Sequence, residues 1–304
     1  MLDLLNKLIC VSLTVHIWSG QKKLQPEDLN LNAGDIPPEE LASLGVKKIC
    51  DPDELKTFQS LRRRAERVCE AAGVRFLGGY AIPQAKSEAV VAELRAIAAD
   101  FAKEKQLFLA RYSASIEVWL KTLPEQWRPM VVEAIEPIES IANRLSCAHQ
   151  TFQVQGVKGL DDELDTSVRS LGERLINEIS RAAIQTWDAS FKGRTKVSQK
   201  ALRPIRATLE KAKGLSFLEG SLCTIIAGIE EELNSLPKSG YLQGRDFRQL
   251  VGVLHTLADL EGVKNPVIFE REEDDAFEKD IEPSLEREEH TSLSVAVAMP
   301  ATWF

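Results

Sequence analysis

The chain has 304 residues, 44% of them hydrophobic, and a formal net charge of −8 at pH 7. This length and apolar content can supply the core of one large domain or two ordinary ones. Unbroken apolar runs such as residues 225–229 are far shorter than the ~20 residues that cross a bilayer, so no transmembrane helix is expected.

The first 83 residues are expected to form an N-terminal α+β cap. Residues 9–18 alternate between apolar and more polar side chains, which predicts a half-buried strand. Asp51 at the N-cap, Pro52 at the first helical position and the stop at Gly73 predict a helix over residues 52–72. Residues 74–82 contain paired glycines between aromatic residues, which predicts a strand-like connector that pairs with the N-terminal strand.

Two long helices are expected to dominate residues 84–265. The first covers residues 87–120, with Ser87 as its cap and an apolar residue at every third or fourth position. At 1.5 Å per residue it is roughly 50 Å long, so it needs a second long helix beside it. Residues 160–191 supply one. The predicted fold is therefore mainly α, an elongated bundle built on two long antiparallel helices with a coiled-coil-like seam, plus a small β element near the N-terminus.

Shorter elements fill the rest of this region. Three prolines break residues 125–147 into short helices, and residues 151–157 are predicted to be a bend or a short strand. Further helices are expected over residues 198–213, 217–233 and 245–260, with Pro204 kinking the first of them or delaying its start.

Residues 266–304 are predicted to be a flexible acidic tail. Residues 270–290 contain 11 acidic and 3 basic side chains, which gives −8 and therefore all of the net charge. An alternating apolar peptide and an aromatic end follow. Two interpretations stay open, because the peptide can dock on a partner or pair with the N-terminal strand. Its docking candidates are Leu293, Val295, Val297, Trp303 and Phe304.

The opposite charge is concentrated in residues 192–213, with a local net charge of +7. Such a segment can neutralise phosphates, although its charges spread over a broad arc and no aromatic side chains interleave them. The alternative is a solvated or internally paired surface, with the acidic tail as one pairing partner. The candidate nucleic-acid contacts are Lys192, Arg194, Lys196, Lys200, Arg203, Arg206 and Lys213.

No pattern in the chain indicates catalysis. The four histidines lack metal-site spacing, Gly78-Gly79 lacks the rest of a phosphate-binding loop, and no Gly-x-Ser-x-Gly occurs. Five scattered cysteines without a Cys-x-x-Cys pair are typical of reduced thiols. We therefore expect a cytoplasmic, non-enzymatic protein with no catalytic, cofactor or metal site.

Three blocks, residues 11–24, 44–52 and 73–80, together resemble a bacterial family filed as a domain of unknown function. The resemblance covers roughly residues 8–260, and the family is carried on plasmids, integrative elements and phage-like islands. It implies two partners, a MoxR-type AAA+ ATPase similar to the cobaltochelatase small subunit and a protein with a von Willebrand-type metal-binding domain. The resulting hypothesis is a non-enzymatic adaptor or scaffold for that ATPase system. The alternative is a nucleic-acid-binding accessory factor that uses residues 192–213.

Overall fold

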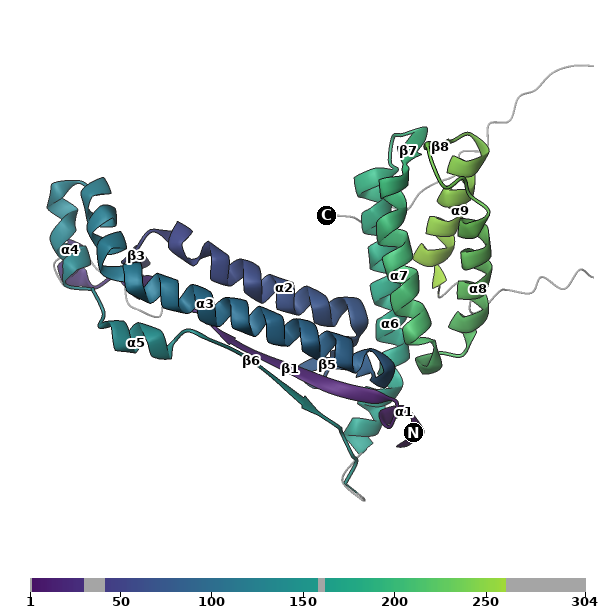
Figure 1. Ribbon diagram of the computed structural model, residues 1–304, viewed down its shortest axis with the longest axis horizontal. Coiled ribbons are helices and arrows are strands. Elements are labelled where there is room, and N and C mark those ends of the chain that lie inside the picture. The colour runs from purple at the N-terminus through teal and green to yellow at the C-terminus, as the bar shows by residue number, and fades with distance from the viewer. Residues whose placement is uncertain (1, 30–41, 158–161, 261–304) are drawn as a thin grey trace, which may run out of the picture. The chain divides into compact units, whose positions relative to one another are not determined.

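The computed structural model describes residues 2–29, 42–157 and 162–260, and it is mainly helical, as predicted (Figure 1). Residues Met1–Asn265 gather into one compact unit. The predicted acidic tail and its apolar end lie outside the described residues.

A four-stranded antiparallel sheet and the helices α2 and α3 form the first half of the unit, and the strand order is β4-β5-β1-β6. The strands of this half are β1 (Leu8–His16), β2 (Gln21–Lys23), β3 (Val46–Lys48), β4 (Val74–Phe76), β5 (Gly79–Pro83) and β6 (Ser146–Phe152). The helices are α1 (Leu2–Leu5), η1 (Pro26–Leu29), η3 (Pro52–Leu55), α2 (Lys56–Ala72), α3 (Gln84–Thr122), η4 (Glu125–Trp127), α4 (Arg128–Val132) and α5 (Ile138–Asn143).

Strand β1 confirms the predicted N-terminal strand, and its alternation sets which face is covered. Val11 and Leu13 pack with buried residues of α2 and α3, while Thr14 and His16 are exposed. The period of two residues therefore places one face of β1 against the helices.

The predicted connector is a hairpin, β4–β5, and β5 pairs with Leu8–Val11 of β1 as expected. Leu77 and Gly78 form its two-residue turn, and both have positive φ, 46° and 75°. Two consecutive left-handed residues are what the twist of a tight hairpin requires.

Asp51 caps the second predicted helix through its carboxylate, which accepts the backbone N–H of Asp53 at 2.9 Å. The 3-10 turn η3 leads into α2, which ends at Gly73 as predicted. The expected cap of the long helix α3 was wrong. This helix begins directly after Pro83, and the Ser87 hydroxyl donates to the Gln84 carbonyl inside the first turn.

The predicted pairing of the two long helices was also wrong. Phe101, Phe108 and Ile116 of α3 are buried against α2, α5 and the region around Trp18. The apolar stripe of α6 (Asp162–Ser190) belongs to a separate cluster. An amphipathic stripe requires an apolar neighbour but does not specify which one, and α2 with the sheet meets that requirement for α3.

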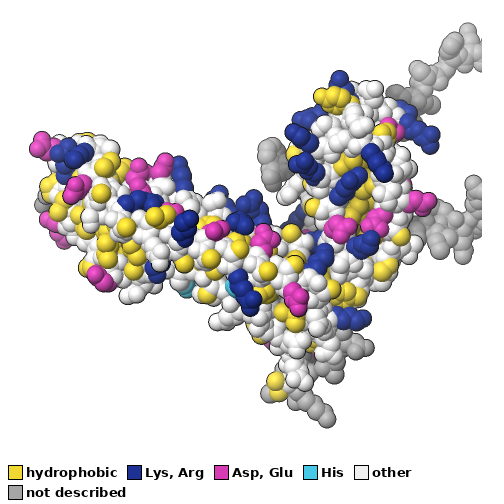
Figure 2. All heavy atoms as spheres, viewed as in Figure 1, with side chains coloured by type: hydrophobic (Ala, Val, Ile, Leu, Met, Phe, Trp, Pro, Cys, Tyr) yellow, Lys and Arg dark blue, Asp and Glu magenta, His cyan; other side chains and the backbone are white. Residues whose placement is uncertain are grey.

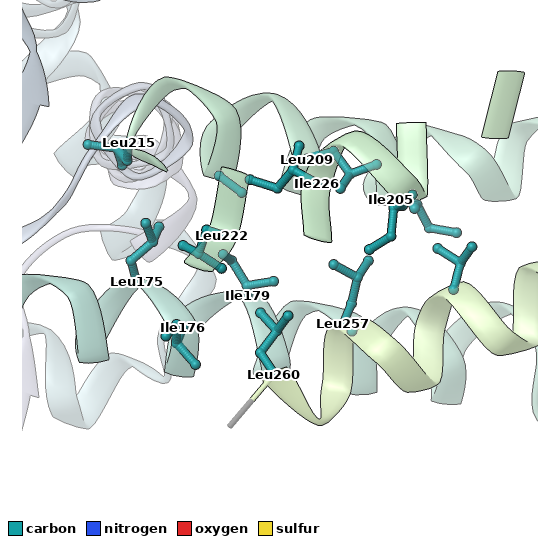
Figure 3. Packing of buried hydrophobic residues seen from close by; sticks show 14 of the residues in the cluster. Leu175, Ile176, Ile179, Ile205, Leu209, Leu215, Leu222, Ile226, Leu257 and Leu260 are labelled. Atoms are coloured by element: carbon teal, nitrogen blue, oxygen red, sulfur yellow. The ribbon is translucent and has the colours of Figure 1, made fainter. Parts of the chain in front are cut away.

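Helices α6, α7 and α9, with α8, form the second half of the unit around one large core. Figure 3 shows Ile179, Leu209, Ile226 and Leu257 pointing toward a shared interior from four helices. Pro204 lies in the first turn of α7, so that helix starts late, as one reading of the sequence anticipated. The remaining elements are β7 (Lys196–Ser198), η5 (Gln199–Ala201), α7 (Leu202–Gly214), η6 (Ser216–Leu218), α8 (Ser221–Asn234), β8 (Tyr241–Gln243) and α9 (Arg245–Ala258).

Strand β6 was not predicted over its full length, since the expected bend or strand began at residue 151. It pairs with Cys10–His16 of β1 and is an end strand of the sheet. Its sequence has little β-branched content, so its extended conformation depends on pairing with β1 more than on local strand propensity. The alternative in which the C-terminal peptide pairs with β1 concerns residues outside the described part and stays a prediction.

Candidate functional surfaces

The predicted basic segment runs from the end of α6 through β7 and η5 into α7. Leu202, Ile205 and Leu209 are buried on one side of α7, so its Arg203 and Arg206 side chains lie on the opposite, exposed side. All seven predicted nucleic-acid contacts are exposed to solvent.

Three of those seven cations have local partners. Lys192 lies 3.2 Å from the Asp188 carboxylate, and Lys213 lies 2.9 Å from Glu230, whose hydrogen bond raises the pKa of Lys213. The ammonium of Lys196 lies over the Tyr241 ring, 5.2 Å from its centroid.

The other four cations, Arg194, Lys200, Arg203 and Arg206, form no ion pair with any described residue. They are therefore the members of the segment whose charge is most available to an anionic ligand.

A second basic surface lies on α2, and it is not among the nucleic-acid contacts predicted from the sequence. Figure 2 shows Lys and Arg side chains, in dark blue, over both α2 and α7. Arg62 is held by Glu66 at 3.0 Å and Arg64 by Asp100 at 3.2 Å, but Arg63 and Arg67 form no ion pair with a described residue. The signal was present as three consecutive arginines, Arg62 to Arg64.

Lysine side chains join α7 to α2 and to α3, close to the C-terminal ends of α2 and α7. The ammonium of Lys211 on α7 donates to the Glu70 carbonyl of α2 at 2.7 Å and to the Glu178 carboxylate at 2.5 Å. Lys86 on α3 donates to the Glu210 carbonyl of α7 at 3.0 Å. Each cation meets carbonyls at the negative end of a helix dipole, which is a favourable arrangement. A cavity of about 450 Å³ at this joint is lined by Glu70, Ala71, Arg75, Glu178, Ile179, Ala182, Ala207, Thr208 and Lys211.

A group of exposed apolar side chains lies in the last turns of α3 and in the segment that follows it, and we name it the tip patch. Val118, Trp127, Val132 and Ile135 are between 38% and 63% exposed. Their neighbours Val131 and Ala134 are buried, and Ala134 belongs to the core cluster that contains Phe108. Figure 2 shows hydrophobic side chains, in yellow, over the region of α4. The sequence did not reveal this patch, because exposure of Trp127 depends on how the short helices fold back.

No group of three or more potential metal-ligating side chains occurs in the described parts of the chain. His255 lies beside Trp187, with 5.7 Å between the two ring centroids, at an edge of the core formed by α6, α7, α8 and α9. Burial raises the pKa of the Cys10 and Cys69 thiols to about 11 and that of Cys50 to about 12, so these thiols are protonated at neutral pH and react slowly. Residues 2–29, 42–157 and 162–260 include no helix that is both long and apolar enough to cross a membrane.

Comparison with known proteins identifies a family for this chain. The family model described as a protein of unknown function (DUF3150) matches residues 5–259. No curated protein and no solved structure matches the chain.

Proposed function

We propose that this chain, which belongs to the DUF3150 family of proteins of unknown function, is a non-enzymatic adaptor of a MoxR-type AAA+ ATPase system carried on a mobile element. The ATPase and a von Willebrand-type domain protein are its proposed partners, in keeping with the resemblance of residues 11–24, 44–52 and 73–80. The observation that supports an adaptor is the tip patch.

The tip patch has the chemistry of a protein interface. Large apolar side chains that are exposed close together on a protein surface are costly in water and commonly mark sites of association. The sequence positions and exposures of these four side chains suit such a site. Tryptophan is strongly enriched among the residues that dominate binding energy, so Trp127 is the expected anchor.

Replacing Trp127 and Val132 by serine tests this proposal. We expect the affinity for the proposed partner, the MoxR-type ATPase, to fall roughly tenfold or more, since the variant removes the anchor of the interface. Affinity is measured by calorimetry with the purified ATPase. The control is Ile184→Ser on α6, which alters a side chain that is 49% exposed outside the patch. Unchanged affinity of the patch variant, with circular dichroism showing an intact fold, would contradict the proposal.

Nucleic-acid binding is the second candidate function, and it is favoured by Arg194, Lys200, Arg203 and Arg206, the four cations that form no ion pair with a described residue. Exposed cations that are free of carboxylates can replace counterions on a phosphate backbone, which makes the affinity depend steeply on salt. This candidate does not exclude the first, because an adaptor can hold both a protein and a nucleic acid.

The double variant Arg203→Ala/Arg206→Ala is expected to bind DNA more weakly than the wild type at low salt. The slope of log K against log salt should become shallower by about 1.8, because two phosphate contacts are lost. The matched control is Lys192→Ala/Lys213→Ala, which removes the same charge from residues already paired with Asp188 and Glu230. Equal slopes for the two variants would refute a specific role for the unpaired arginines.

A further inference from the structure

The outward face of α2 carries two arginines that the helix itself does not neutralise. Arg63 and Arg67 are exposed and one helical turn apart, and the Arg67 guanidinium reaches only the Arg63 carbonyl, at 3.2 Å. The nearby carboxylates are already engaged, since Glu66 holds Arg62 and Glu70 holds Arg75 at 3.0 Å. The face therefore has a net positive charge.

This face of α2 runs into the cavity that α2 shares with α7. Ala71, which lines that cavity, lies one turn after Arg67 on the same side of α2. On α7, Ala207 also lines the cavity and lies one turn after Arg203. Arg67 and Arg203 thus each lie one helical turn from a residue that lines this cavity, and Lys211 joins the two helices beside it through the Glu70 carbonyl.

The charge of this surface suits a polyanion. Glu178 on α6 is bound to Lys211 of α7, whereas Glu210 on α7 forms no ion pair with a described residue. Glu66 and Glu70 are likewise paired, so four arginines and a single glutamate on these stretches of α2 and α7 form no ion pair with a described residue. Guanidinium groups bind phosphate oxygens with two parallel hydrogen bonds, which lysine does not do.

We infer that Arg63 and Arg67 on α2, together with Arg203 and Arg206 on α7, bind the phosphate backbone of a DNA duplex. This inference rests on the proposed nucleic-acid function and extends its site to a second helix. A duplex is the expected form, since the residues lining the cavity include no aromatic side chain on which an unpaired base could stack.

The test uses the full chain and a 30-base-pair duplex of random sequence, with binding followed by fluorescence anisotropy between 50 and 200 mM salt. The variant Arg63→Ala/Arg67→Ala should reduce the salt slope by about 1.8, and the variant of all four arginines by about 3.6. The matched control is Arg62→Ala/Arg64→Ala, which removes equal charge from the same helix but at side chains held by Glu66 and Asp100. It should reduce the slope much less.

The outcomes separate this inference from the function on which it rests. If Arg63→Ala/Arg67→Ala binds like the wild type while Arg203→Ala/Arg206→Ala is weakened, α2 is not part of the site but the nucleic-acid function stands. If neither variant changes the salt slope, both the inference about α2 and the proposed nucleic-acid function are wrong. A control variant that is weakened as much as Arg63→Ala/Arg67→Ala overturns the inference, because net charge alone then explains the loss. Equal affinity and slope for a single strand of 30 nucleotides overturns the assignment to a duplex. Circular dichroism melting verifies that each variant is folded.

Discussion

Replacing Phe108 by alanine is expected to lower the free energy of unfolding by about 3–5 kcal/mol. The Phe108 side chain is completely buried in the middle of α3, and its ring lies 5.7 Å from the ring of Phe58, 6.3 Å from Trp18 and 5.9 Å from Tyr112. The substitution removes apolar burial, leaves a cavity and breaks three aromatic contacts. Phe108 thus joins α2, α3 and the segment after β1.

The matched control is the neighbouring residue, because Leu107 is 51% exposed. Leu107→Ala should change the free energy of unfolding by no more than about 0.5 kcal/mol, as is usual for surface positions. Urea denaturation followed by circular dichroism measures both variants, and Phe108→Leu provides an intermediate case if the alanine variant is too unstable to purify. Similar losses of unfolding free energy for Phe108→Ala and Leu107→Ala would mean that the aromatic cluster around Phe108 is not the core of the first half of the unit.

Elements with strong local signals could be predicted from the sequence. Asp51 followed by Pro52 gives a cap and a first helical residue within two positions, and the structure has that cap. The alternation of residues 9–18 gave β1, and the absence of Gly and Pro over residues 87–120 gave most of α3. Each of these signals lies within one element and needs no knowledge of distant residues.

The arrangement of these elements could not be predicted in the same way. The stripes of α3 and α6 look alike in sequence, yet they contribute to different cores. An apolar stripe shows that an interface exists, whereas the choice of partner depends on every other apolar face in the chain. Strand β6 was missed for the same reason, because the residues of β1 with which it pairs lie at least 130 positions earlier in the chain.

The candidate surfaces also combine features that the sequence shows with features that depend on the fold. The excess of cations in residues 192–213 is visible in the sequence, but whether a cation is free depends on pairs formed across the fold. Arg64 is neutralised by Asp100, 36 positions away, and Arg63 beside it has no such described partner. The sequence therefore predicted the basic segment as a candidate binding surface, but it did not single out Arg63 and Arg67 as candidate contacts.

The second large effect is expected for Gly79→Ala, which should destabilise the protein by about 3 kcal/mol, at the upper end of the cost of overpacking. A Cβ at Gly79 would lie 2.4 Å from the Val11 carbonyl oxygen and 3.2 Å from its carbon. These atoms belong to the backbone of β1, so no side-chain rotation can relieve the clash and the β1–β5 pairing must open. Gly228→Ala, in α8, is the control, because nothing lies within 4 Å of its added Cβ.

Since alanine favours a helix over glycine by about 1 kcal/mol, Gly228→Ala should raise the melting temperature while Gly79→Ala lowers it. Both shifts can be read in one thermal denaturation experiment on the full chain. The opposite signs matter, because a general intolerance of larger residues would lower both melting temperatures. A Gly79→Ala variant as stable as the wild type would show that β5 does not approach β1 as closely as the sheet requires, and the register that places Ile82 opposite Ile9 would then need revision.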